Sequence, residues 1–317
     1  MSIHDRRGLK EAAARSLAHS PDHRQTVLFS VGLAAAAALL VSILSLILDG
    51  FIANTGGLSG MALRSTLTTV QALLSLGLSA LMPFWGYGLT HAMLKLSRQE
   101  AASRSTLLEG FRRFGPVLRL MLLRYLIYCS IAMLAIQFAV GVLSLTPLAA
   151  PATQFLLDNA ELLTSAAVDE ATVLALMDAM MPLMAVSFAV TLGVLAPFFY
   201  SFRMADLRIM DDPKCGAIAA LVGSARMMRH NRLAVFKLDL SFWWYYLAQG
   251  LLTALVNGNL ILSMLGVPLP ISEDISLLLF LTAGLLGQLA LYYFFRAHVE
   301  VTYAKAYQSL FPEKPLA

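Results

Sequence analysis

Charged side chains gather at one edge of the long apolar segments in this sequence. Six of them form a candidate polar layer, namely Arg203, Asp206, Lys237, Asp239, Arg296 and Glu300. A charge in lipid is costly unless it is paired or reaches water, so charges at such an edge are candidates for function. Two interpretations remain open. Either the basic members bind anions or lipid headgroups, or the layer consists of ion pairs and snorkelling side chains that stabilise the helices.

Spacing predicts which of these charges meet. Asp206 follows Arg203 by three residues and Glu300 follows Arg296 by four, so each pair can share a helix face. Asp239 has no such partner in its own helix, because the nearest cation lies only two residues away. We therefore expect Asp239 to pair with Arg203 or Arg296 from a neighbouring segment.

A second group of basic residues ends two short amphipathic segments. Arg112 and Arg113 end the first of these segments, and Arg229 and Arg232 end the second. A helix with an apolar stripe and a basic edge lies in the plane of the lipid headgroups and is attracted by anionic lipid. These four arginines predict a collar that contacts headgroups.

Motifs for catalysis are missing from the sequence. It contains no Gly-x-Ser-x-Gly, no His-Glu-x-x-His, no phosphate-loop lysine motif and no Cys-x-x-Cys. The two cysteines, Cys129 and Cys215, are isolated, which disfavours a structural disulfide and a metal site. We expect no catalytic residue, no cofactor and no metal, and a protein that is not an enzyme.

Six stretches free of Asp, Glu, Lys and Arg are the elements that position these groups. Crossing a hydrocarbon core takes about 20 apolar residues in a helix, so each stretch is long enough. The chain is 58% hydrophobic and 13% charged, with a mean hydropathy of +0.72, which agrees with a membrane protein. The predicted fold is all-α: a polytopic membrane protein with one membrane domain over residues 1–317 and transmembrane helices at about 26–48, 66–94, 118–145, 179–203, 236–259 and 275–300.

Basic residues alternate between the two sides of these spans. Of the 23 lysines and arginines, 22 fall in the N-terminal arm, the second and fourth connections and the tail, and Arg64 is the exception. Because cytoplasmic loops retain Lys and Arg, both termini are predicted to be cytoplasmic. This charge asymmetry also accounts for the basic face without a nucleic-acid partner. The opposite side is acidic, and the role of its longest segment, at about 146–178, stays open.

Short amphipathic helices are predicted before the first, third and fifth spans, at about 8–19, 105–115 and 213–230. Thr106 and Glu109 have capping-box spacing, and Asp212 is placed as an N-cap. A threefold parallel repeat of amphipathic helix, span and span explains this order. Ordinary aromatic belts at the membrane interfaces explain it equally well.

Amides and glycines are the other notable residues inside the spans. The amides would bond to neighbouring helices or line a narrow polar path. Glycines would permit close helix contacts. The residues in question are Gln71, Gln137, Gln249, Asn257, Gln288, Gly250, Gly284 and Gly287.

Three segments of the sequence carry a family resemblance: Leu9 to His19, the segment ending Phe111-Arg112-Arg113-Phe114, and above all the block from Ser224 to Phe242, which contains Leu238-Asp239-Leu240-Ser241-Phe242. In these segments the sequence resembles a bacterial family called domain of unknown function 975. The resemblance covers essentially the whole chain, although Trp243 comes earlier than the family's tryptophan and His230 stands where a glycine is usual. The resemblance implies an integral protein of the bacterial cytoplasmic membrane and supplies no activity.

The function that these observations favour is non-enzymatic. We expect a lipid-binding or membrane-organising scaffold protein that uses the collar and the polar layer, with anionic headgroups and proteins at the cytoplasmic face as partners. The alternative is a small-molecule or lipid transporter or export factor whose path runs between the repeats.

Overall fold

The computed structural model describes residues 2–20, 23–54, 58–159, 170–258, 262 and 273–310. Throughout these residues the regular structure is helical, as the all-α prediction requires. The elements are α1 Arg6–Ala18, α2 His23–Asn54, α3 Leu58–Ser97, η1 Arg104–Leu108, α4 Glu109–Arg112, α5 Phe114–Leu143, η2 Pro147–Ala149, α6 Ala150–Asp158, α8 Glu170–Phe202, α9 Ala205–Asp211, α10 Ala217–Met228, α11 Arg232–Leu240, α12 Trp243–Val256, α14 Glu273–Leu291, the π-helical turn η3 Tyr292–Arg296 and α15 Ala297–Leu310.

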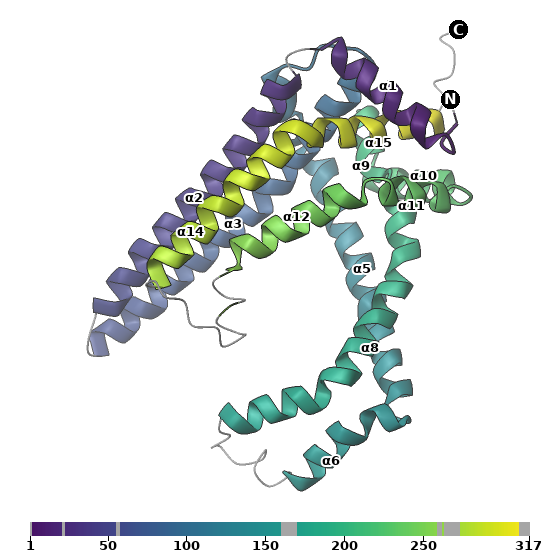
Figure 1. The fold of residues 1–317 in the computed structure, drawn as a ribbon. Helices are drawn as coiled ribbons and strands as arrows, with labels where there is room; N and C mark the ends of the chain where they lie inside the picture. The colour runs from purple at the N-terminus through teal and green to yellow at the C-terminus, as the bar shows by residue number, and fades with distance from the viewer. Residues whose placement is uncertain are drawn as a thin grey trace.

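The long helices form two arms that diverge from a common end (Figure 1). One arm contains α2, α3, α12 and α14, and the other contains α5 and α8, with α6 beside the far part of α8. At the common end, which we call the apex, α1, α9, α10, α11 and α15 gather. The first and last described helices, α1 and α15, pack against each other there.

Four apolar helical stretches in the described part of the chain are long enough to cross a membrane. They are Ser65–Ser97, Phe114–Leu143, Thr172–Asp211 and Leu278–Leu310. Large apolar side chains along the arms are exposed, for example Leu76 at 67%, Leu126 at 62% and Phe188 at 65%. A lipid environment would cover such surfaces, which would be unfavourable in water.

Three helix hairpins pack in the order that the sequence suggests: α2 with α3, α5 with α8, and α12 with α14. In the third hairpin, a Cβ atom added at Gly284 would lie 2.4 Å from a methyl of Val256, and one at Gly287 would lie 2.4 Å from a methyl of Leu252. These two predicted close helix contacts are confirmed. Gly250 has open space at its Cβ position, so the same prediction was wrong there.

The predicted fifth span, 236–259, is not one continuous helix. The shorter helix α11 ends at Leu240, and α12 begins at Trp243 and has 14 residues. The predicted sixth span, 275–300, instead continues through a π-helical turn into α15 and ends at Leu310. Apolar composition alone did not locate these changes of helix geometry. The fourth predicted span, 179–203, begins earlier, at Glu170, so helix takes up part of the predicted outer segment 146–178.

The three short amphipathic helices also differ from prediction. In place of 8–19, α1 covers Arg6–Ala18, and its Leu9 and Ala13 are fully buried at the apex. The segment 105–115 is a 3₁₀ turn followed by one turn of α-helix, with Leu107 fully buried. The segment 213–230 becomes helical only at Ala217. Much of the apolar surface that was expected to meet lipid is therefore covered by protein.

Both predicted N-terminal caps were wrong for local reasons. The hydroxyl of Thr106 accepts a hydrogen bond from the Ser103 N–H at 3.2 Å, so the capping interaction lies three residues earlier than predicted. Asp212 accepts a bond from the Lys214 N–H at 2.9 Å and forms a turn before α10. Aspartate favours such turns as readily as helix caps.

Candidate functional site

Three clusters at the apex each combine an aspartate, a tyrosine and an arginine. In the first, Arg124 Nη1 of α5 lies 2.8 Å from both carboxylate oxygens of Asp206 on α9. Tyr87 of α3 donates its hydroxyl to Asp206 Oδ1 at 2.7 Å. The guanidinium also donates to the Tyr87 hydroxyl at 3.4 Å. This cluster joins three helices that are far apart in the sequence.

The second cluster surrounds Asp239 near the end of α11. Arg203, at the junction of α8 and α9, lies 3.9 Å from Asp239 Oδ1, which confirms the predicted pairing. Tyr303 of α15 donates to the same carboxylate oxygen and accepts a hydrogen bond of 2.8 Å from the hydroxyl of Tyr246. The Arg203 guanidinium also lies 4.8 Å from the centre of the Tyr303 ring. A cation over an aromatic face is stabilised by the ring's quadrupole.

The third cluster links the end of α3 to α9 and α15. Arg98 Nη2 lies 2.6 Å from Asp211 Oδ1, and the Tyr307 hydroxyl donates to Asp211 Oδ2 at 3.0 Å. The side chains of Arg98 and Asp211 are 27% and 15% exposed. Hydrogen bonds with a charged partner are roughly twice as strong as neutral ones, so this cluster ties three elements firmly together.

The predicted polar layer is brought together only in part. Arg203, Asp206 and Glu300 line one small cavity of about 150 Å³, together with Thr90, Met204, Leu207 and Tyr303. The cavity lies between the first and second clusters, because Asp206 belongs to one and Arg203 to the other. Its charged and hydroxyl-bearing walls suit water or a small polar group, and it is too small for a metabolite of ordinary size.

The predicted contact between Arg203 and Asp206 is replaced by the pairing of Asp206 with Arg124. The helix ends at Phe202 and restarts at Ala205, so the spacing of a continuous helix does not apply. Arg296 lies 4.8 Å from the centre of the Tyr292 ring. In the described part of the chain it forms no ion pair with Glu300, although α15 is α-helical from Ala297 on.

The remaining predicted residues lie on the surface or in structural contacts. The side chain of Lys237 is exposed, and its backbone carbonyl accepts a bond of 3.5 Å from Arg6. Arg113 is only 15% exposed and donates to the carbonyls of Ile209 and Met210 at 3.0 Å each. It therefore caps the end of α9 and is not available to headgroups. The other three collar arginines, Arg112, Arg229 and Arg232, are exposed.

A family model covers nearly the whole chain. A family model described as "Protein of unknown function (DUF975)" matches residues 6–313. The chain belongs to this family. Neither a curated protein nor a solved structure matches the chain.

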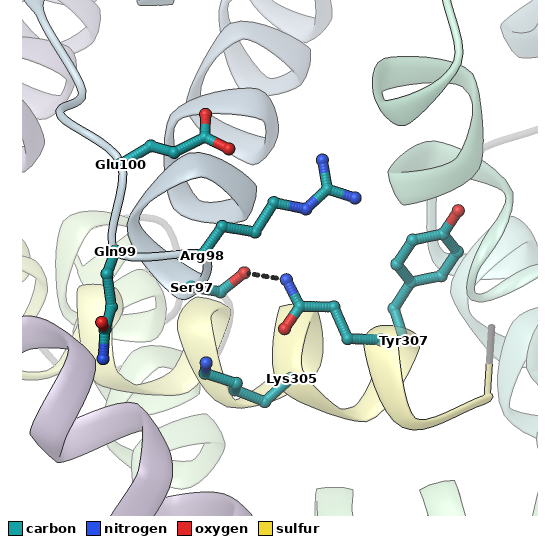
Figure 2. Close-up of a pocket in the computed structure, with 7 residues that line it drawn as sticks. Ser97, Arg98, Gln99, Glu100, Lys305 and Tyr307 are labelled. Carbon is teal, nitrogen blue, oxygen red and sulfur yellow. Dashed lines mark hydrogen bonds between the residues drawn. The ribbon is translucent and has the colours of Figure 1, made fainter. Parts of the chain in front are cut away.

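A polar cavity in this DUF975 protein lies beside the third cluster (Figure 2). It has a volume of about 470 Å³ and is lined by Ser97, Arg98, Gln99, Glu100, Lys305, Tyr307 and Gln308. Gln308 donates to the Ser97 hydroxyl at 2.8 Å and so bridges α15 and the end of α3. Gln99 has a φ of 63°, in the left-handed region that ends the helix.

Several residues of the clusters were not singled out from the sequence. Arg124 lies within a predicted span, and Tyr87, Tyr303 and Tyr307 resemble ordinary interfacial aromatics. The spacing of Tyr303 and Tyr307 by four residues was an available signal, because it puts both hydroxyls on one face of α15. Their aspartate partners lie 64 and 96 residues away, and a single sequence does not reveal such distances.

Two of the amides singled out in the spans of this DUF975 protein, Gln249 and Gln288, bond to a neighbouring element as expected. Gln249 of α12 donates to the Tyr292 hydroxyl at 3.0 Å, and Gln288 of α14 donates to the Thr253 hydroxyl at 3.5 Å. Asn257 donates to the carbonyl of Thr253 in its own helix at 2.8 Å.

Proposed function

We propose that this protein is a non-enzymatic, lipid-binding membrane protein that organises the headgroup region at its apex. The observation that carries the proposal is the surface of α11. Its Leu233, Phe236 and Leu240 are 71%, 45% and 57% exposed and recur at helical spacing, with exposed Lys237 between them. An apolar stripe next to basic side chains is the pattern of a helix that lies in the headgroup plane.

The opposite face of α11 fixes the orientation of this stripe. Ala234, Val235 and Leu238 are buried in the apex core, and Asp239 is held by Arg203 and Tyr303. The helix is therefore attached to the protein on one side and largely exposed on the other, where Phe236 also touches the Tyr200 ring at 5.8 Å between ring centres. Arg232 at its start is also exposed. Basic residues near an anionic surface each contribute about 1 kcal/mol of attraction.

The three polar clusters support a structural role for most of the buried charges. Each aspartate already has an arginine and a tyrosine as partners. A carboxylate with satisfied partners is poorly suited to act as a general base. This favours lipid contact at the surface over chemistry in the layer.

The topology that goes with this proposal has six spans and both termini in the bacterial cytoplasm. The apex, with α1, α15 and the basic α11, would lie at the cytoplasmic interface. Proteins at the cytoplasmic face are the other proposed partners. The three packed hairpins are compatible with three parallel repeats, which superposition of the hairpins would test.

Lipid analysis of protein extracted with its native membrane tests the proposal. We expect the wild type to retain anionic lipid above its bulk fraction, and Arg232→Gln/Lys237→Gln to retain about half as much. Arg7→Gln/Lys214→Gln removes the same charge from two other exposed positions and is the matched control. Wild-type protein that carries lipid in bulk proportions only would refute the proposal.

A transporter or export factor for small molecules or lipids is the second candidate. A cavity of about 440 Å³ between α3, α5 and α8 favours it, because Arg124, Arg203 and Asp206 reach this cavity among aromatic and apolar side chains. Transport requires a path that opens alternately to each side. Cysteines at Met121 and Phe202 would be labelled by impermeant reagents from both sides of the membrane if such a path exists, and from one side at most if it does not.

A further inference from the structure

A groove of about 570 Å³ lies between α5 and the beginning of α10, apart from the polar layer and from α11. Leu122, Leu123 and Leu126 of α5 line one side, and residues 216–219 line the other. Its volume is in the range of sites that hold small ligands. The surface is mainly apolar, with Arg119 as its one charged lining residue.

The groove is charged at one end, where Arg119 lies, and apolar along the rest of its length. Arg119, Leu122 and Leu126 follow one another at spacings of three and four residues, so they lie along one face of α5. At 1.5 Å per residue this face extends about 10 Å from the cation to the last leucine. Leu122 and Leu126 are 59% and 62% exposed, and Ile218 across the groove is 68% exposed. An amphiphile with a charged head and a hydrocarbon chain matches this arrangement.

Charge complementarity identifies the charged head group of this amphiphile as an anion. Arg119 is exposed and has no hydrogen bond or ion pair with any residue in the described part of the chain. No carboxylate lines the groove. A guanidinium binds phosphate through two parallel hydrogen bonds, which makes arginine suited to phosphate recognition. The ammonium group of a zwitterionic choline lipid would instead bring a like charge close to Arg119.

We propose that this groove binds one anionic phospholipid, with the phosphate on Arg119 and an acyl chain along Leu122 and Leu126. The inference rests on the proposed lipid-binding function and goes beyond it. The α11 surface would collect several headgroups through general attraction, whereas the groove is a discrete site with one occupant.

Native mass spectrometry of the full-length protein in detergent, titrated with dioleoyl phosphatidylglycerol or dioleoyl phosphatidylcholine, tests this site. We expect one tight phosphatidylglycerol per chain and at least tenfold weaker phosphatidylcholine. Arg119→Gln should weaken phosphatidylglycerol about tenfold. Arg112→Gln removes an exposed arginine outside the groove, 68% exposed, and should leave the tight site unchanged. Unchanged affinity in Arg119→Gln would overturn the proposal.

A second pair of variants tests whether an acyl chain occupies the apolar part of the groove. Ile218→Trp places a bulky ring in the groove and should also remove the tight lipid. Val222→Trp is its control, because Val222 is 52% exposed on the same helix but does not line the groove. Retention of the tight lipid by Ile218→Trp would count against the site. Displacement of bound lipid by glycerol phosphate alone would overturn it as well, because the occupant would then be a soluble phosphate.

The same titration separates this inference from the proposed function. If Arg232→Gln/Lys237→Gln loses anionic lipid while both groove variants keep the tight one, the groove proposal fails and the proposed function stands. If the wild type shows no preference for phosphatidylglycerol, both fail.

Discussion

Each cluster at the apex uses the same three side-chain types. An aspartate from a short helix meets an arginine and a tyrosine from two other elements, in the sets Asp206 with Tyr87 and Arg124, Asp239 with Tyr303 and Arg203, and Asp211 with Tyr307 and Arg98. Tyrosine contributes apolar area and one hydrogen bond, which suits a partly buried site near an interface. The repetition indicates that the charges mainly hold the apex in one arrangement.

Replacing Asp206 tests whether a cluster stabilises the fold. Asp206→Asn leaves Arg124 without its anion, so we expect the free energy of unfolding to fall by about 2 kcal/mol. Breaking a fully buried pair costs ~3–5 kcal/mol. The cost is smaller here because the side chains of Arg124 and Asp206 are 26% and 32% exposed. Thermal unfolding in detergent measures the effect. Asp212→Asn is the control, because Asp212 is exposed and directly follows α9, the helix that contains Asp206.

A double-mutant cycle with Arg124→Gln assigns the effect to the pair. The double variant should be less destabilised than the sum of the single variants, because each single change already breaks the same contact. Strictly additive losses would mean that Asp206 and Arg124 act independently, contrary to their 2.8 Å contact.

The ion-pair partner of an aspartate could be predicted from the sequence only where few partners were possible. Asp239 lacked a partner in its own helix, and the common depth of the charges predicted Arg203 or Arg296 as its partner, of which the structure shows Arg203. The partner of Asp206 was missed because the helix breaks at Met204, between α8 and α9. That break removes the helical spacing to Arg203 and turns Asp206 toward Arg124.

The short segment η1 and α4 docks on α3 by direct backbone contact. A Cβ atom at Gly88 would lie 1.8 Å from the carbonyl oxygen of Leu107, and one at Gly110 would lie 1.9 Å from that of Phe84. The two glycines thus face opposite backbones, and no side chain fits at either position. This contact holds the beginning of α5 against the end of α3, and so helps to position Arg124 beside Tyr87.

Substitution of Gly88 tests this docking. Gly88→Ala forces the two backbones apart, so we expect the free energy of unfolding to fall by about 3 kcal/mol, or the protein not to fold at all. Gly86→Ala is a matched control two residues away, with open space at its Cβ position. It should be neutral or up to ~1 kcal/mol more stable, because alanine favours helix. Equal behaviour of the two variants in thermal unfolding would contradict the docking.

Element boundaries followed from composition only where helices are long and regular. Spans near 66–94 and 118–145 correspond to α3 and the larger part of α5. The division of 236–259 into α11 and α12 did not follow, because its apolar content continues across Ser241 and Phe242. Tertiary contacts stabilise this break: Lys10 donates to the Ser241 carbonyl at 2.9 Å and lies 4.0 Å from the centre of the Phe242 ring. Burial near these groups and the charge of Arg6 lower the pKa of Lys10.

In the molecule as a whole, the polar clusters and the apolar surfaces lie in different regions. The clusters, the buried core groups and the exposed apolar stripe of α11 with its basic neighbours lie at the apex, where the two arms meet (Figure 1). The helices of the arms expose leucines and phenylalanines along their length. Charge asymmetry in the sequence predicted this division before the helices were placed. The divergence of the two arms was not predictable, because it depends on packing between residues far apart in the chain.

The proposed orientation of the apex can be tested by cysteine accessibility. In a background with Cys129→Ala and Cys215→Ala, Ser144→Cys directly follows α5, whose C-terminal end lies away from the apex, and Asp212→Cys directly follows α9 at the apex (Figure 1). Both positions are exposed. The positive-inside rule predicts that an impermeant maleimide labels Ser144→Cys in intact bacteria and labels Asp212→Cys only after permeabilisation. Labelling in denaturant confirms that both thiols are reactive. The opposite pattern would reverse the topology and place the apolar stripe of α11 and its basic neighbours away from the cytoplasmic leaflet, whose anionic lipids are the basis of the proposed function.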